Sequence, residues 1–158
     1  MGTDGSRGTM LAVDWEDYWR VGPATSDEIA RVESTLGRLF PQDVREALRD
    51  HQGMAPVPAM LEVFPERPRV DFGPLFHCRE GSSGNLLARV ELLRRRGYPA
   101  TLVPISMSSG GQSHFALDYS HDAPRIAFVR PELGYDSDRC VVPVADSLTE
   151  LLARLEPE

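Results

Sequence analysis

The side chains best suited to chemistry are few and lie far apart in the sequence. The residues that most resemble a set of metal ligands are His114, Asp118 and His121, which include two of the four histidines. Residues 114 and 118 share a face if their segment is a strand, because alternate side chains point to the same side. Residue 121 falls in the turn that follows, whereas metal ligands must converge on one point. We therefore expect no metal site.

The motifs of covalent and phosphate chemistry are also missing. Ser82 and Ser83 lack the G-x-S-x-G context of a nucleophile, and Cys140 opens an apolar stretch typical of an inert buried thiol. All 17 basic residues are arginine, so catalytic or phosphate-binding lysines are excluded. Gly110 and Gly111 precede no helix start, which favours a hairpin turn over a phosphate loop. No two carboxylates stand out as acid and base, and we expect a binding protein without catalytic residues or cofactors.

The composition limits the class of protein. A chain of 158 residues that is 41% hydrophobic and 26% charged suits one globular domain, expected over residues 11–156 behind a disordered leader at 1–10. The net charge of -7 argues against direct nucleic-acid binding and favours a basic protein partner. No apolar run approaches the ~20 residues of a bilayer span, and the first residues lack the apolar core of a secretory signal. Cys78 and Cys140 are too few for a disulfide framework, so we expect a cytoplasmic location.

The elements that would position a site are centred on a predicted β-meander. Its strands are expected at about residues 101–107, 113–119 and 125–130. In the middle strand Phe115, Leu117 and Tyr119 alternate with smaller or polar residues, the period of a strand with one buried face. Such a meander cannot bury its apolar face alone, so other elements must cover it.

Four predicted helices, two before the meander in an N-terminal pair and two elsewhere in the chain, supply this cover. A capping box at residues 25–28 begins a helix that runs to about Leu36 and ends at Gly37. Leu39 and Phe40 are expected to be apolar anchors before a second helix over about 42–51. Further helices are expected over about 85–96, and after a short strand at 140–144, where Asp146 or Ser147 caps the last helix. The arginine run at 94–96 suits a solvated helix end better than a phosphate site.

Two segments are harder to interpret. In residues 11–21 the aromatic side chains Trp15, Tyr18 and Trp19 have the spacing of one side of a short helix. They would either dock on the core or form an acidic, aromatic contact patch. Residues 54–76 carry five prolines, so the strand candidates at 61–64 and 75–78 are expected only at sheet edges.

The order of four motifs resembles the SUKH superfamily, named for the fungal Smi/Knr cell-wall synthesis regulators. The motifs are IARVESTLG at 29–37 leading into LFP at 39–41, the helix end at 47–53, the Gly110-Gly111 turn followed by FALD at 115–118, and the closing strand and helix at 144–152. The resemblance implies an α+β fold in which a mostly antiparallel sheet, with its central meander at about 101–130, is covered by an N-terminal helix pair, a middle helix and a C-terminal helix.

The resemblance also implies a role in protein binding. Bacterial members look like immunity proteins that neutralise toxins, many of them nucleases, and an acidic chain suits a basic toxin. The candidate contacts are Trp15, Asp17, Tyr18, Trp19, Asp118, Glu132, Tyr135, Asp136 and Asp138. The acidic loop residues among them also fit ordinary solvated turns. Two alternatives stay open: a regulatory adaptor that binds a cellular enzyme or scaffold, and a small-molecule binder or enzyme with a cleft near His114 and Asp118.

Overall fold

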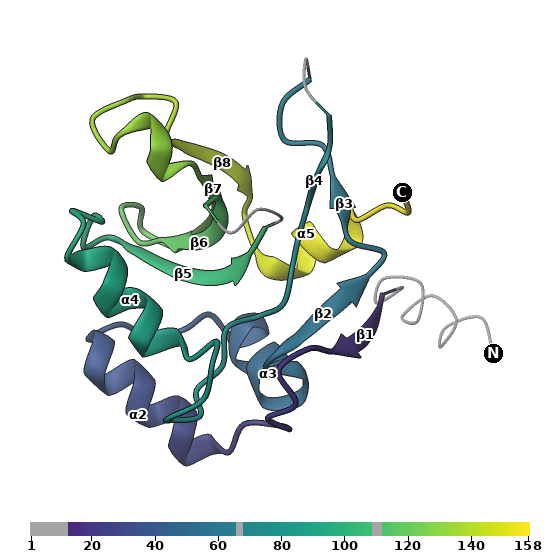
Figure 1. Ribbon diagram of the computed structural model, residues 1–158, viewed down its shortest axis with the longest axis vertical. Helices are drawn as coiled ribbons and strands as arrows, with labels where there is room; N and C mark the ends of the chain where they lie inside the picture. The colour runs from purple at the N-terminus through teal and green to yellow at the C-terminus, as the bar shows by residue number, and fades with distance from the viewer. Residues whose placement is uncertain (1–12, 66–67, 109–111) are drawn as a thin grey trace.

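A computed structural model describes residues 13–65, 68–108 and 112–158 (Figure 1). The expected leader at 1–10 and the Gly110-Gly111 turn lie outside these residues. Within them the chain forms four α-helices, eight strands and a short 3₁₀ helix, with antiparallel pairing throughout the named strands. This arrangement confirms the predicted α+β class.

The largest sheet has four strands in the order β5-β6-β7-β8. Its strands are β5 (Leu102–Met107), β6 (His114–Asp118), β7 (Arg125–Val129) and β8 (Val141–Ala145). The first three are the predicted meander, and the predicted strand at 140–144 joins it as the fourth. Each strand pairs antiparallel with the next in sequence, so residues that follow one another in the chain also neighbour one another in the sheet.

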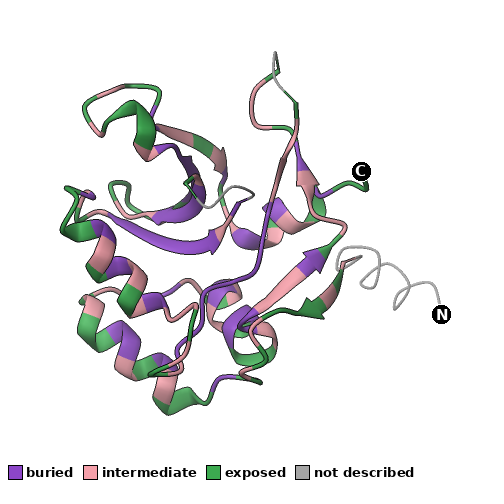
Figure 2. Ribbon diagram, viewed as in Figure 1, coloured by how far each residue is buried: buried purple, intermediate pink, exposed green. Residues whose placement is uncertain are grey.

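The prediction of a single buried face for β6 is wrong, because both faces of the strand are covered. Phe115 and Leu117 pack into the main core, whereas Ala116 belongs to a second cluster with Tyr98 and Cys140. All three of these strand residues are buried, and β5 and β7 are buried over most of their length (Figure 2). Cys140 is buried, as its apolar context predicts, and burial raises the pKa of its thiol.

The predicted helix pair is confirmed. Helix α2 (Ser26–Leu36) begins at a complete capping box between Thr25 and Glu28 and ends at Gly37, whose φ of 70° only glycine adopts readily. Helix α3 (Gln42–His51) follows after a short connection. Phe40 is buried as expected, whereas Leu39 is 71% exposed and is therefore not an anchor.

The other two helices also begin near the expected residues. Helix α4 (Leu86–Arg94) has Asn85 as its N-cap and packs along β5. Helix α5 (Leu148–Ala153) is capped by Ser147 and contacts both β8 and α3. The arginines that end α4 are exposed, in agreement with a solvated helix end.

The expected helix at the N-terminal aromatic residues is wrong. Strand β1 (Asp14–Asp17) pairs antiparallel with β2 (Met54–Val57) instead. The backbone amides of Tyr18 and Trp19 then both donate to the carbonyl of Gly53, at 3.1 and 3.0 Å. The segment is extended because its backbone hydrogen bonds are made to a strand about 40 residues further along the chain, which three aromatic positions cannot reveal.

The proline-rich segment forms only short pieces of sheet. Strands β3 (Met60–Leu61) and β4 (Val70–Asp71) pair with each other, so the expected strand at 61–64 extends no further than its first residue. Of the expected strand at 75–78, Leu75 and His77 form isolated bridges. Residues 72–78 are all buried and run through the middle of the molecule (Figure 2). In the described ranges, no helix is both long and apolar enough to cross a bilayer.

Candidate functional site

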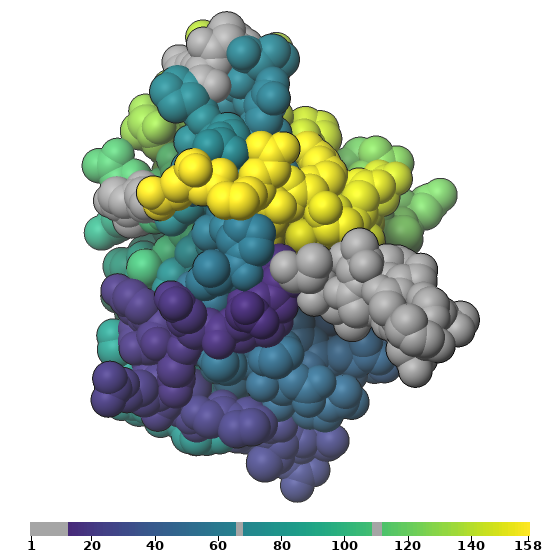
Figure 3. Space-filling model, turned by 90° about the vertical axis from the view of Figure 1, so that its right-hand side faces the viewer, coloured from purple at the N-terminus to yellow at the C-terminus, as the bar shows by residue number. Residues whose placement is uncertain are grey.

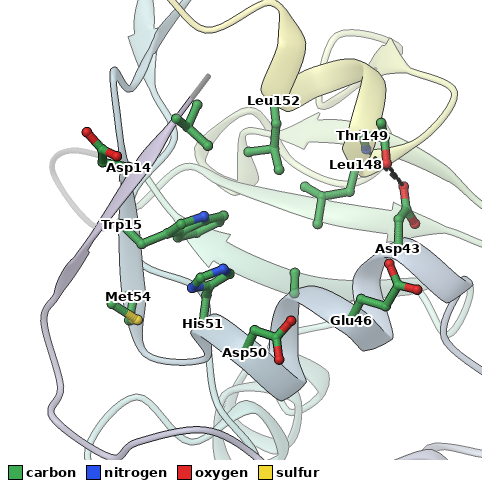
Figure 4. A pocket seen from close by; sticks show the side chains of 12 residues that line it. Asp14, Trp15, Asp43, Glu46, Asp50, His51, Met54, Leu148, Thr149 and Leu152 are labelled. Atoms are coloured by element: carbon green, nitrogen blue, oxygen red, sulfur yellow. Dashed lines mark hydrogen bonds between the residues drawn. The ribbon is translucent and has the colours of Figure 1, made fainter. Parts of the chain in front are cut away.

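The candidate site is an acidic groove bounded by β1, α3 and α5. These elements come from three distant parts of the chain, and Figure 3 shows the N-terminal part (purple), residues of about 40–60 (blue) and the C-terminal segment (yellow) together on one face. The groove has a volume of about 510 Å³. Leu148 and Leu152 of α5 point into it from one side and α3 forms the other (Figure 4).

Four carboxylates line this groove. Asp43, Glu46 and Asp50 lie on one face of α3, at positions i, i+3 and i+7, and Asp14 lies across from them on β1 (Figure 4). All but Asp43 are exposed. A hydrogen bond from the neighbouring Arg49 lowers the pKa of Asp50, so this carboxylate is ionised at neutral pH.

Asp43 differs from the other three because it also holds the groove together. One of its carboxylate oxygens, Oδ2, accepts hydrogen bonds from the backbone amide of Thr149 at 2.8 Å and from its hydroxyl at 3.0 Å. Thr149 lies in the first turn of α5, where backbone amides lack partners within the helix. Asp43 therefore fixes the start of α5 against α3.

A stack of two rings forms the centre of the groove. The rings of Trp15 and His51 are 4.6 Å apart between centroids and almost parallel, at 6°. Burial lowers the pKa of His51, with Asp50 opposing the shift, so its imidazole is neutral at pH 7. No lysine or arginine is among the described residues that line the groove, and of its four carboxylates Asp50 is paired with Arg49, which lies just outside the lining, at 3.1 Å.

The structure divides the predicted contact residues between two surfaces. Trp15 lies in the groove, and Asp17 and Tyr18 are exposed next to it along the chain, Tyr18 at 57%. Trp19 instead turns inward and stacks on Phe76, with 6.0 Å between ring centroids. For Trp15 and Trp19 the structure therefore shows rings docked on the core, and only Tyr18 is an exposed aromatic side chain.

The second group of predicted residues lies on the side of the main sheet away from β1 (Figure 1). Glu132 is in the 3₁₀ helix η1 (Pro131–Leu133), and Asp136 and Asp138 follow it in an exposed loop. Tyr135 packs edge-on against Tyr98, with 5.7 Å between the ring centroids. Asp118 accepts hydrogen bonds from the amide and hydroxyl of Ser120, as in an ordinary turn.

The cleft suggested near His114 and Asp118 does not form. His114 is 5% exposed and its Nε2 lies 2.8 Å from the Tyr98 hydroxyl, whereas Asp118 faces His121 across 3.7 Å in the following turn. The cavity that His114 lines does not include Asp118. Among the described residues, no three potential ligands cluster in a way that could hold a metal ion.

Most of the groove was not predicted from the sequence. Asp14, Asp43, Glu46, Asp50 and His51 were not among the candidates, although the acidic spacing on the predicted second helix was visible. What could not be read from the sequence is that β1 and α5 meet this helix face. The three elements are brought together only by long-range packing.

Fold and groove together define a class: a small α+β domain that carries an acidic groove with an aromatic centre. Residues 23–154 match the SMI1/KNR4 family (SUKH-1), so the chain belongs to this family and the predicted resemblance is confirmed. Its members are generally associated with protein partners. No individual curated protein matches the chain. The matched residues include α3 and α5, whereas β1 precedes them.

Proposed function

We propose that this chain is a non-enzymatic immunity protein, which neutralises a toxin in the cytoplasm by binding a basic surface of it in the acidic groove. The observation that carries the proposal is the set of four carboxylates around the Trp15–His51 stack, of which Asp50 has Arg49 as a partner beside the groove and no lysine or arginine belongs to the described lining. Membership of a family associated with protein partners supports it. Inhibition would come from steric and electrostatic blockage, without turnover.

The groove suits arginine and lysine side chains from a partner. Their aliphatic stems would pack on the apolar wall of Leu148 and Leu152, and their charged heads would reach Glu46 and Asp50 at the rim. Trp15, which is half-buried already, loses little conformational freedom when a partner covers it. Interfaces commonly gain most of their affinity from such central aromatic residues and from desolvated charge pairs.

The test is a rescue assay with the toxin domain encoded beside this gene, produced in the same cells. The wild-type chain should restore growth, and the double variant Glu46→Gln/Asp50→Asn should bind the toxin roughly tenfold more weakly or worse. A matched control, Asp122→Asn/Glu158→Gln, removes two exposed charges elsewhere and should rescue like the wild type.

A third variant, Asp136→Asn/Asp138→Asn, tests the other predicted surface. If it abolishes binding while the groove variant does not, the acidic loop is the binding surface and the groove is not. If no toxin gene adjoins this one and no complex forms, the immunity role is wrong, and the regulatory adaptor becomes the better explanation.

A further inference from the structure

A second cavity lies between α4, the end of β5 and the residues around η1, apart from the acidic groove. Its volume is about 320 Å³, at the lower end of the range in which proteins bind small ligands. Apolar side chains, among them Phe76, Leu93 and Met107, form much of its wall. The polar groups that line it include two arginines from α4 and the segment after it, Arg89 and Arg96. The proposed immunity function uses none of these residues.

Arg89 is the unusual residue of this cavity. Its guanidinium carbon lies 5.2 Å from the centre of the Phe76 ring, and the side chain is half-buried. The other half-buried arginines of the described chain each have a carboxylate or a carbonyl as hydrogen-bond partner, as Arg45 has Glu33 and Arg79 has Glu28. For Arg89, the described residues provide neither.

The position of Arg89 is also electrostatically unfavourable. Burial lowers its pKa, and the positive charge of Arg96 on the same cavity lowers it further. A half-buried guanidinium that loses part of its hydration and faces a second arginine is stabilised by a nearby negative charge, which favours an anion as its partner. The guanidinium can offer two parallel N–H donors to such an anion, which is the geometry that carboxylates accept.

The charges of the lining indicate how negative that anion should be. Arg89 and Arg96 contribute two positive charges and Glu132 one negative charge, which leaves a net charge of +1. His114 adds none at neutral pH, because burial lowers its pKa to about 4. A single negative charge would therefore balance the cavity, whereas a doubly charged phosphate would exceed it and meet Glu132.

We propose that this cavity binds a small carboxylic acid with an apolar body, whose carboxylate pairs with Arg89 and Arg96 while the body packs on Phe76, Leu93 and Met107. The volume holds a molecule of this size and not a helix or strand of a protein partner. Gln112 and Tyr135 supply further polar groups at the same cavity. The site is separate from the toxin-binding groove, so either proposal can fail without the other.

Phenylacetate is a suitable probe, followed by isothermal titration or by amide chemical shifts in NMR. The wild-type chain should bind it, and should bind neutral phenylacetamide and doubly charged phenyl phosphate at least tenfold more weakly. Arg89→Met, which keeps an apolar side chain on Phe76, should weaken phenylacetate binding at least tenfold. Arg95→Gln, an exposed arginine of the same run outside the cavity, should leave it unchanged.

Glu132→Gln provides a test with the opposite sign and does not depend on the stability of the Arg89 variant. It removes the carboxylate that faces the ligand, so phenylacetate should bind more tightly than to the wild type. The proposal is overturned if the wild type does not bind phenylacetate at millimolar concentration, if phenylacetamide binds equally well, or if Glu132→Gln weakens binding.

Discussion

At the scale of single residues, two buried polar side chains take part in specific hydrogen bonds that fold this domain. Glu33 is 8% exposed on an otherwise apolar face of α2, where its carboxylate accepts from the amide of Phe40 at 2.7 Å and from Arg45 at 3.0 Å. It thereby ties the end of α2 to the connection and to α3. His114 occupies the second layer of the core, next to Tyr98. Its burial has a measurable consequence for stability.

Stability should fall in mild acid because of His114. Burial lowers its pKa from 6.5 to about 4 in the folded chain, so the unfolded chain takes up a proton first as the pH falls. The stabilisation is complete above pH 6.5 and is lost between pH 6.5 and 4. Between pH 7 and pH 4.5 the wild type should lose about 2 kcal/mol of unfolding free energy relative to His114→Gln, measured by urea denaturation.

Two other histidines, the half-buried His51 and the buried His77, do not disturb this comparison. His51 and His77 also have pKa values lowered by burial, and both contribute with the same sign in the wild type and in the variant. Glutamine keeps an acceptor for the Tyr98 hydroxyl, so the variant should fold at pH 7. If the unfolding free energies of the wild type and of His114→Gln depend on pH in the same way, His114 is not the group that titrates.

At the scale of elements, the sequence predicted those helices and strands whose formation depends on residues close together in the chain. The capping box, Gly37 and the alternation in β6 each depend on a few neighbouring residues, and α2 and the meander formed where they indicated. Strand β1 was missed because its hydrogen-bond partner, β2, lies far along the chain. The groove was missed for the same reason, since Asp43 on α3 meets Thr149 on α5 only through packing at a sequence distance of 106.

Two glycine-to-alanine substitutions in the loop before α4, at Gly81 and at Gly84, should differ in how much stability they cost. Gly84 and Gly81 both have positive φ, at 85° and 76°, so alanine strains the backbone at either position by about 1–2 kcal/mol. At Gly84 the new methyl group would also come within 2.4 Å of the Trp19 ring, whereas at Gly81 nothing lies within 4 Å. Gly84→Ala should therefore destabilise the protein by about 1–3 kcal/mol more than Gly81→Ala.

Urea denaturation of the two variants measures this difference, and tryptophan fluorescence reports whether the ring moves. The packing of Trp19 on Phe76 and on the loop closes the N-terminal segment over the core. If both glycine variants lose the same stability and the fluorescence stays unchanged, Trp19 is not held against this loop.

At the scale of the whole molecule, the excess of acid is unevenly arranged. The chain carries 24 acidic and 17 basic residues, a net charge of -7. Many of the arginines form hydrogen bonds or ion pairs within the chain. Arg79, for example, pairs with Glu28 and donates to the carbonyl of Pro23, which joins the loop before α4 to the start of α2. The groove gathers four carboxylates, of which Asp50 pairs with the exposed Arg49 outside the described lining. The local field at the groove should therefore differ from that of the molecule as a whole.

The salt dependence of toxin association distinguishes an attraction that comes from the groove from one that comes from the net charge of the whole molecule. Glu46→Gln/Asp50→Asn and Asp122→Asn/Glu158→Gln each remove two carboxylates, so both change the net charge from -7 to -5. If the groove is the docking site, the association rate of the wild type should fall roughly tenfold or more between 50 and 500 mM NaCl, because salt screens the steering field. In stopped-flow measurements the groove variant should associate more slowly at low salt and show a shallower dependence, whereas the control variant should follow the wild type. If the association rates of the two variants depended on salt equally, net charge alone would attract the toxin. The groove would then not be the docking site.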